Sequence, residues 1–207
     1  EQRALDDAAY RDQLAYLLER SPFYRQRLGS QPPSGLDEIG ALPLTDKREL
    51  RETCTEDNPI GAHLCVPRFE IARVYSTSGT TGTPSYIPLT AADVESWITG
   101  SARSYAASGV EPGQRVVTTY GAGPFVAGAA LASLERIGLS HIPVGAGSTE
   151  RLVRAIQALR PEAVALTPSY AAYLIEWAAE RGFDLPGSSV ERLLVAGEPG
   201  GGEPAFR

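Results

Sequence analysis

The chain has 207 residues, of which 43% are hydrophobic and 21% are charged. This composition is that of a globular domain with a substantial core and excludes a disordered tail. The net charge of -6, with lysines and arginines scattered along the chain, excludes nucleic-acid binding through phosphate neutralisation.

The cysteines and the first residues indicate where in the cell the protein is expected. Cys54 and Cys65 do not make a disulfide framework and the first residues lack a signal-peptide pattern, so we expect a cytoplasmic location. The uncharged stretch 116–134 has about the length of a bilayer span, but its glycines and Pro124 divide it into a strand, a turn and a helix. We therefore expect no membrane contact. Without any methionine, and with Pro204 in a pattern typical of a first helical turn, the sequence is expected to be truncated.

The first third of the chain is expected to be helical and polar. Apolar residues recur at helical spacing through 4–20, and Ser21-Pro22 ends that helix before a short second one. Thr45 is predicted to cap a third short helix that runs to about Cys54. We expect residues 1–68 to form a helical cap and lead-in, and residues 69–207 to form a partial α/β domain.

From about residue 69 the pattern changes to alternating strands and helices. Strands are expected at 70–79 and 86–90, followed by a helix at 91–109 that Thr90 caps. Further strands are expected at 115–120, 141–145, 163–168 and 192–197, with helices at 125–137, 149–159 and 169–181 between them. This order predicts an α/β fold with a mostly parallel sheet and flanking helices. Ligands bind at the carboxyl ends of such strands, which directs attention to the turns there.

The stretch YSTSGTTGTPSYIPLT, residues 75–90, is rich in hydroxyls and glycines and carries no charge. Gly79 and Gly82 allow positive φ and a close approach of the backbone to a ligand. Hydroxyl donors and backbone N–H groups together suit phosphate oxygens. The spacing of the glycines and the lack of a following lysine exclude a Walker A loop. A plain surface loop is the alternative for such a run taken alone.

The wider sequence resembles a known family. TSGTTGTPSYIPLT resembles the phosphate-binding signature [ST]SGTTGxP of the adenylate-forming superfamily. LPLTDKREL and VPRFEIARVYSTSGTTG resemble the approach to this loop in phenylacetate–coenzyme A ligases and coenzyme F390 synthetase-like proteins, and YGAGPFVAGAALASLERIG, IPVGAGSTERLVRAIQALRP, LTPSYAAYL and VAGEPG resemble their later segments in the same order. The resemblance spans about 40–207 and implies the N-terminal portion of the fold.

The resemblance implies an AMP-forming ligase that uses ATP to activate an aromatic carboxylic acid and passes the acyl group to coenzyme A. The alternatives left open are an enzyme that loads a carrier protein in a biosynthetic pathway and a non-catalytic module that keeps the fold. A homodimer is also left open. Magnesium is expected with ATP, but its ligand, the ribose-binding aspartate and the catalytic lysine are expected outside this sequence. We therefore expect this portion alone to be inactive and assign no catalytic residue within it.

The resemblance also implies positions for the binding residues. Those expected to bind ATP phosphates are Thr77, Ser78, Gly79, Thr80, Thr81 and Gly82, with Thr83 where many relatives carry lysine or arginine. Those expected to form the acid pocket are Tyr120, Gly121, Gly123, Phe125, Ser169 and Tyr170. Those expected to lie against the adenine and the acyl group are Ala196, Gly197, Glu198 and Pro199.

Blander interpretations stand beside these assignments. Tyr120 and Phe125 are equally compatible with core packing at a strand end and a helix start, and Glu198 with a solvated turn. Ser148 or Thr149 is a simple helix N-cap in the turn that follows Gly145. Cys54, His63 and Cys65 offer only three ligands without a C-x-x-C pair, so no metal site is expected. His141, which begins a buried strand, is expected to be structural.

Overall fold

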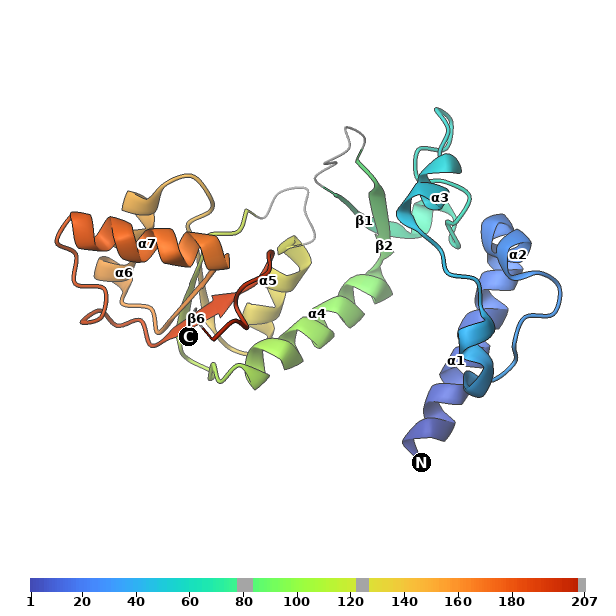
Figure 1. Cartoon of the computed structure of the whole chain (residues 1–207), viewed down its shortest axis with the longest axis horizontal. Coiled ribbons are helices and arrows are strands. Elements are labelled where there is room, and N and C mark those ends of the chain that lie inside the picture. Colours follow the sequence, from blue (N-terminus) through green and yellow to red (C-terminus); the bar gives the residue numbers. More distant parts are fainter. Residues whose placement is uncertain (78–83, 122–126, 205–207) are drawn as a thin grey trace. The chain divides into compact units, whose positions relative to one another are not determined.

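The computed structural model describes residues 1–77, 84–121 and 127–204 (Figure 1). The chain divides into two compact units, residues 1–91 and residues 92–207. The predicted division between residues 68 and 69, which separates a lead-in from an adenylation domain, stays a prediction. Within the described ranges, none of the helices combines the length and the apolarity that crossing a bilayer requires.

Two helices open the first unit, as the sequence predicts. α1 (Gln2–Arg20) and α2 (Pro22–Leu28) meet at Ser21, which is fully buried. The Ser21 hydroxyl accepts from the N–H of Tyr24 at 3.4 Å and donates to the carbonyl of Ala62 at 3.0 Å. Pro22 occupies the first helical position, where its missing N–H costs no hydrogen bond. Ser21 therefore both begins α2 and ties it to a segment 41 residues later in the chain.

A capping box fixes the next helix. After the 3-10 helix η1 (Leu36–Ala41), α3 (Lys47–Glu52) begins at Asp46. The Asp46 carboxylate accepts from the N–H of Glu49 at 2.8 Å, and the Glu49 carboxylate accepts from the N–H of Asp46 at 2.9 Å. The prediction that Thr45 caps this helix was wrong by one residue, because the reciprocal pair joins Glu49 to the residue three positions before it, which is Asp46.

A two-stranded antiparallel sheet completes the first unit. The 3-10 helix η2 (Arg68–Glu70) leads into β1 (Ile71–Ser76), which pairs with β2 (Tyr86–Thr90). The ladder closes at Ser76 opposite Tyr86. The two strands predicted around the hydroxyl-rich stretch are confirmed, although they form a sheet separate from the parallel one.

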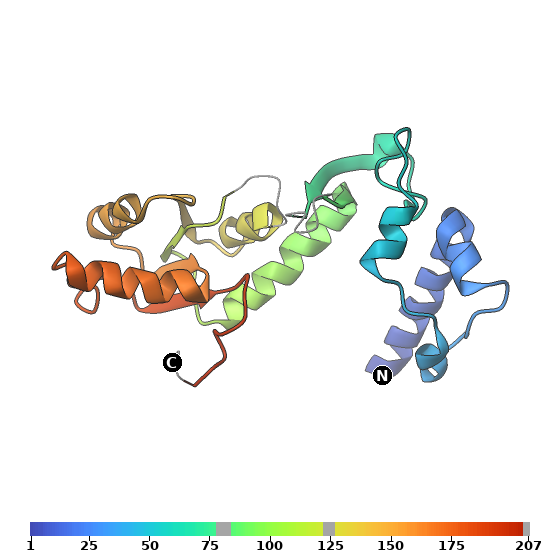
Figure 2. The same cartoon turned by 45° about the horizontal axis from the view of Figure 1, so that its top comes forward.

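The second unit carries the parallel sheet. Its strands run in the order β4 (Ser140–Pro143), β3 (Arg115–Thr118), β5 (Ala163–Leu166) and β6 (Arg192–Val195). All three neighbouring pairs are parallel, which confirms the predicted fold class. The helices are α4 (Ala91–Ala107), α5 (Ala127–Arg136), α6 (Thr149–Leu159) and α7 (Pro168–Glu180) (Figures 1 and 2).

The strand residues alternate between two cores. Val117, Val164 and Leu166 pack with residues of α6 and α7, whereas Val116 and Ala165 pack with α5. Successive strand side chains point to opposite faces, so the central strands β3 and β5 each contribute to both clusters. The sheet is therefore covered by helices on both faces.

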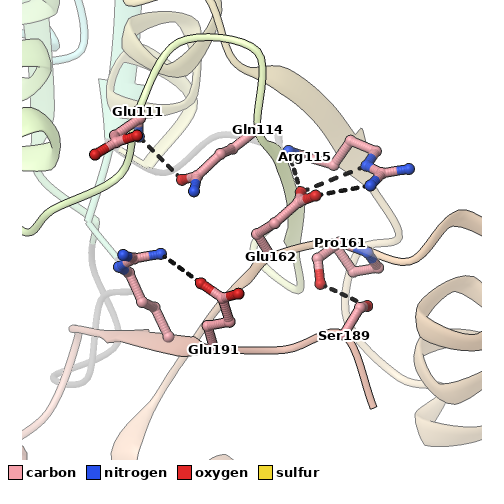
Figure 3. Close-up of polar contacts among 8 residues, drawn as sticks. Glu111, Gln114, Arg115, Pro161, Glu162, Ser189 and Glu191 are labelled. Carbon is pink, nitrogen blue, oxygen red and sulfur yellow. Dashed lines mark hydrogen bonds and ion pairs between the residues drawn. The ribbon is translucent and has the colours of Figure 1, made fainter.

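The amino ends of the strands are joined by polar contacts (Figure 3). The Glu162 carboxylate accepts from the backbone N–H of Arg115 at 2.7 Å and from its guanidinium Nη2 at 2.7 Å. These bonds from Arg115, with its positive charge, lower the pKa of Glu162 to about 2. The hydroxyl of Ser189 donates to the carbonyl of Pro161 at 2.8 Å. These contacts hold the amino edge of the sheet together.

Candidate functional site

A cleft of about 780 Å³ lies at the carboxyl ends of β3 and β5. Each strand of this sheet ends two residues before its predicted end, so that residues such as Thr119 and Thr167 leave the ladder and reach the edge. The turn before α6 and one side of α7 supply the remaining walls. The lining residues are Thr119, Tyr120, Gly121, Ala146, Gly147, Ser148, Thr149, Glu150, Thr167, Tyr170, Tyr173 and Trp177.

Tyr120 is held by two strands distant in the sequence. Its hydroxyl donates to the carbonyl of Leu166 at 2.6 Å and lies 3.3 Å from the carbonyl of Ala196. Burial raises the pKa of Tyr120, with a further contribution from Tyr105, so the phenol stays a hydrogen-bond donor. The ring packs against the core cluster of β3 and α5 and also lines the cleft. Tyr120 is thus part of the core and also borders the cleft, and its role in an acid pocket stays a prediction.

Tyr120 also borders a second cleft. This one has a volume of about 380 Å³ and lies between α4 and β6. Ala196, one of the predicted nucleotide-turn residues, is among its lining residues. The Tyr120 ring therefore lies between the space beside α6 and α7 and the space beside β6.

An aromatic stripe on α7 forms one wall of the larger cleft. The Tyr170 hydroxyl lies 3.0 Å from Oγ1 of Thr149, and its ring stacks on Tyr173 at 6.1 Å between centroids. Trp177 follows, with the Arg181 guanidinium 4.5 Å from the ring centroid. Sequence reasoning found Tyr170 but missed Tyr173 and Trp177. Their spacing of three and seven residues from Tyr170 on a predicted helix was the signal that could have found them.

Ser169 and Glu198 meet at the amino end of α7. The Glu198 carboxylate accepts from the backbone N–H of Ser169 at 2.8 Å and from its hydroxyl. These two bonds, the hydroxyl's first, lower the pKa of Glu198. Glu198 is exposed but tied to α7, which a freely solvated turn residue would not be. Gly197 has φ of 95°, a conformation that favours glycine. Ser169 thus joins the turn after β6 instead of lining the cleft with Tyr170.

Thr77 is the one predicted phosphate-binding residue within the described ranges. Its N–H donates to the carbonyl of Ser85 at 3.0 Å, and its Oγ1 accepts from the N–H of Ser85 at 3.1 Å. The Nζ of Lys47, which sequence reasoning did not single out, donates to the same Oγ1 at 3.2 Å. Thr77 belongs to the first unit and the cleft to the second. The predicted residues Ser78, Gly79, Thr80, Thr81, Gly82, Gly123 and Phe125 lie outside the described residues.

The remaining polar candidates have structural contacts. The Ser148 hydroxyl accepts from the N–H of Arg151 at 3.2 Å, as the N-cap interpretation predicts. His141 Nε2 lies 2.8 Å from Thr118 Oγ1, and burial lowers the pKa of His141, with Glu135 opposing. Among the described residues, no three histidine, cysteine or acidic side chains come together as a metal site.

Comparisons with known proteins show which proteins the chain is similar to. No family model matches it. It is 39% identical over 203 residues to phenylacetate–coenzyme A ligase of Thermus thermophilus, covering 95% of this chain and 44% of that one. It is 32% identical over 205 residues to phenylacetate–coenzyme A ligase of Aromatoleum evansii, covering 96% and 46%.

A solved structure agrees in fold. 2-Hydroxyisobutyryl-CoA ligase, in complex with 2-HIB-AMP and CoA, superposes with a TM-score of 0.87 at 33% identity, covering 98% of this chain and 46% of that one. The chain spans less than half the length of the relatives it matches. Because the matches to the phenylacetate–coenzyme A ligases extend over nearly all of its residues, the chain belongs to that family of adenylate-forming proteins.

Proposed function

We propose that the complete natural polypeptide is an AMP-forming ligase that activates an aromatic carboxylic acid and transfers it to coenzyme A. The observation that carries the proposal is the aromatic-walled cleft at the carboxyl ends of β3 and β5. Its place agrees with where ligands bind in parallel α/β sheets. Its rings suit a flat acyl group, since offset or edge contacts between rings add to simple area burial.

The reaction has two steps. In the first, a carboxylate oxygen of the acid attacks the α-phosphorus of ATP; the new O–P bond forms while the bond to the β-phosphate oxygen breaks, and pyrophosphate leaves with that electron pair. In the second, the thiol sulfur attacks the acyl carbon, AMP leaves, and the thiol proton passes to solvent. Catalysis of the first step depends on positioning and on donors arranged before charge develops.

The described residues contribute positioning. Tyr120 is held at two points by backbone carbonyls, so its ring is a fixed wall for the acid. Tyr170 is held by Thr149 and by stacking on Tyr173, which fixes a second part of the cleft's lining. Fixed walls keep the acid in one orientation and exclude water from the reacting carboxylate. The hydroxyls and N–H groups of 77–82 are proposed to bind the phosphates.

Magnesium is expected to accompany ATP, but the described residues form no metal-binding group. The ligands of magnesium are expected outside this sequence. Coenzyme A is proposed as the acceptor because the relatives carry coenzyme A in their names. A carrier-protein thiol is the alternative acceptor.

Acid-dependent exchange of pyrophosphate into ATP tests the first step. The complete polypeptide is assayed with phenylacetate, benzoate, a longer aryl acid and 2-hydroxyisobutyrate. Exchange that favours the aryl acids supports the proposal, and exchange with 2-hydroxyisobutyrate alone would assign a small aliphatic acid instead. No exchange with any carboxylic acid by the folded protein would leave the non-catalytic alternative. Coenzyme A and a phosphopantetheinylated carrier protein are then compared as acceptors.

Two substitutions test whether residues 77–82 bind phosphate. Thr80→Val and Thr81→Val each remove one proposed donor and should lower exchange by roughly tenfold or more. Thr99→Val, which removes an exposed hydroxyl of α4, is the control and should leave exchange unchanged. Equal exchange in all three variants would show that these hydroxyls do not contact phosphate.

A further inference from the structure

The turn that follows β6 passes close to the amino end of α7. Gly200 has φ of 118°, a conformation that favours glycine, and a Cβ atom added to it would lie 3.7 Å from Cβ of Pro168. A Cβ atom added to Gly201 would lie only 2.6 Å from Cγ2 of Val195, the last residue of β6. The chain therefore turns sharply after β6, beside the first residue of α7.

Glu198 is the side chain that joins this turn to α7. Its Oε1 accepts from the backbone N–H of Ser169 at 2.8 Å and also from the Ser169 hydroxyl. The hydroxyl of Thr167 adds a further hydrogen bond to the Glu198 carboxylate. A carboxylate is well placed at the amino end of a helix, because the backbone N–H groups there lack partners and the helix dipole favours negative charge.

The bond from Ser169 completes the first turn of this 13-residue helix. Pro168, the first helical residue, has no N–H. The N–H of Tyr170 donates to Oγ1 of Thr167 at 3.3 Å, as expected of an N-cap. Ser169 lies between them, and its N–H is satisfied by Glu198 from a distant segment of the chain. The N–H groups of residues 168–170 are therefore all used within the protein.

The other end of the turn is held by the neighbouring strand. The N–H of Ala196 donates to the carbonyl of Leu166 at 3.2 Å, and its carbonyl lies 3.3 Å from the hydroxyl of Tyr120. The turn 196–199 is thus attached at two places, at Ala196 to β5 and Tyr120, and at Glu198 to α7. Residues 196–199 are the ones predicted to lie against the adenine and the acyl group.

We propose that Glu198 is a positioning residue, which holds the turn 196–199 in place through Ser169 and does not itself bind the nucleotide. This inference rests on the proposed function, because it takes the turn to lie against the adenine and the acyl group. It is supported by the contacts of Oε1, which already accepts from both donors of Ser169. Ser169 in turn serves the nucleotide side of the site through Glu198 and makes no contact of its own with the acid.

Binding of ATP to the complete polypeptide is measured by calorimetry for three variants. Glu198→Ala removes the acceptor and should weaken binding by about fivefold or more, because the turn loses one of its two attachments and moves. Glu198→Gln keeps an oxygen that accepts from both Ser169 donors and should stay within about threefold of wild type. Glu203→Ala removes an exposed carboxylate of the same segment. It is the matched control and should change binding less than about twofold.

A double-mutant cycle tests whether Glu198 acts through Ser169. Ser169→Ala removes the hydroxyl donor and leaves the backbone N–H, so it should weaken ATP binding less than Glu198→Ala does. The double variant with Ser169→Ala and Glu198→Ala should bind ATP as Glu198→Ala does, because both changes break the same contact. Additive losses would show that the two side chains act separately.

Kinetics separate this role from a purely structural one. A loss of folded protein lowers the apparent kcat of pyrophosphate exchange and leaves the KM for ATP unchanged, whereas a displaced turn raises that KM. Glu198→Ala should therefore raise the KM for ATP, and Glu198→Gln should restore most of it.

Several results would overturn the inference. They are equal ATP binding in Glu198→Ala and wild type, losses in Glu198→Gln as large as in Glu198→Ala, additive losses in the double variant, and no binding of ATP to the folded wild type. Equal losses in Glu198→Gln and Glu198→Ala would assign the carboxylate a direct contact with the ligand. Binding of ATP that depends on Glu198, without exchange for any acid, would overturn the proposed ligase activity and leave the inference standing.

Discussion

The contribution of the Glu162–Arg115 interaction to the free energy of unfolding can be predicted quantitatively. The Glu162 carboxylate takes up three hydrogen bonds from Arg115, one from the backbone N–H and two from the guanidinium (Figure 3). Each pKa unit corresponds to about 1.4 kcal/mol, and lowering the pKa of Glu162 from 4.5 to about 2 sets a ceiling near 3 kcal/mol.

Solvent reduces this ceiling. The Arg115 side chain is 44% exposed and the Glu162 side chain 24% exposed, so screening lowers the contribution to about 1–2 kcal/mol. Glu162→Gln should therefore lower the free energy of unfolding by that amount at pH 7. Glutamine can still accept from the Arg115 N–H, but its amide nitrogen cannot accept from the guanidinium.

The stabilisation by Glu162 should also depend on pH in a predictable direction. Because the folded pKa of Glu162 is lowered, its stabilisation is fully present above about pH 4.5 and is lost as the pH falls toward 2. The difference between wild type and Glu162→Gln in urea unfolding should accordingly shrink between pH 5 and pH 3. Glu150→Gln, which removes an exposed pair with Arg154, serves as the control and should cost under about 0.5 kcal/mol. A difference for Glu162→Gln that stays constant down to pH 3, or one no larger than the control's, would refute the reasoning.

Three further predictions concern single residues. Since burial lowers the pKa of His141, the stability that depends on neutral His141 is present above about pH 6.5 and is lost below it. Wild type should therefore lose more stability between pH 7 and pH 5 than His141→Gln. Equal losses of the two proteins in urea unfolding would contradict this prediction. Tyr120→Ala should change which acid supports pyrophosphate exchange. Tyr120→Phe, which keeps the ring and loses only the hydrogen bonds to Leu166 and Ala196, should keep the acid preference. An unaltered acid preference in Tyr120→Ala would show that the ring has only a packing role. Arg160 has φ of 47° after α6, so Arg160→Gly should raise the free energy of unfolding by about 0.5–1 kcal/mol, and a lower value would show that its side chain has a stabilising role.

Local sequence was sufficient for the elements and their order. The β-branched or apolar runs of residues 115–197 predicted four strands with helices between them, and the helix at 149–159 was predicted with the bounds it has. The strand ends were less well predicted, because the residues after Thr118 or Leu166 are as apolar or β-branched as those before, and only the pairing with neighbouring strands decides where a ladder stops. The Thr45 cap was wrong for a similar reason, since Thr45 and Asp46 are both good caps and the reciprocal bond with Glu49 selects Asp46.

The sequence by itself predicted an α/β fold with a mostly parallel sheet, a hydroxyl-rich stretch between two strands, and the resemblance to the phenylacetate–coenzyme A ligases. Only the tertiary structure decided which side chains meet: the Tyr120 hydroxyl with carbonyls 46 and 76 residues away, Glu162 with Arg115, and Lys47 with Thr77. Periodicity reports how each residue is buried along its own element, whereas hydrogen-bond partners depend on strand order, and the order β4-β3-β5-β6 brings distant segments side by side.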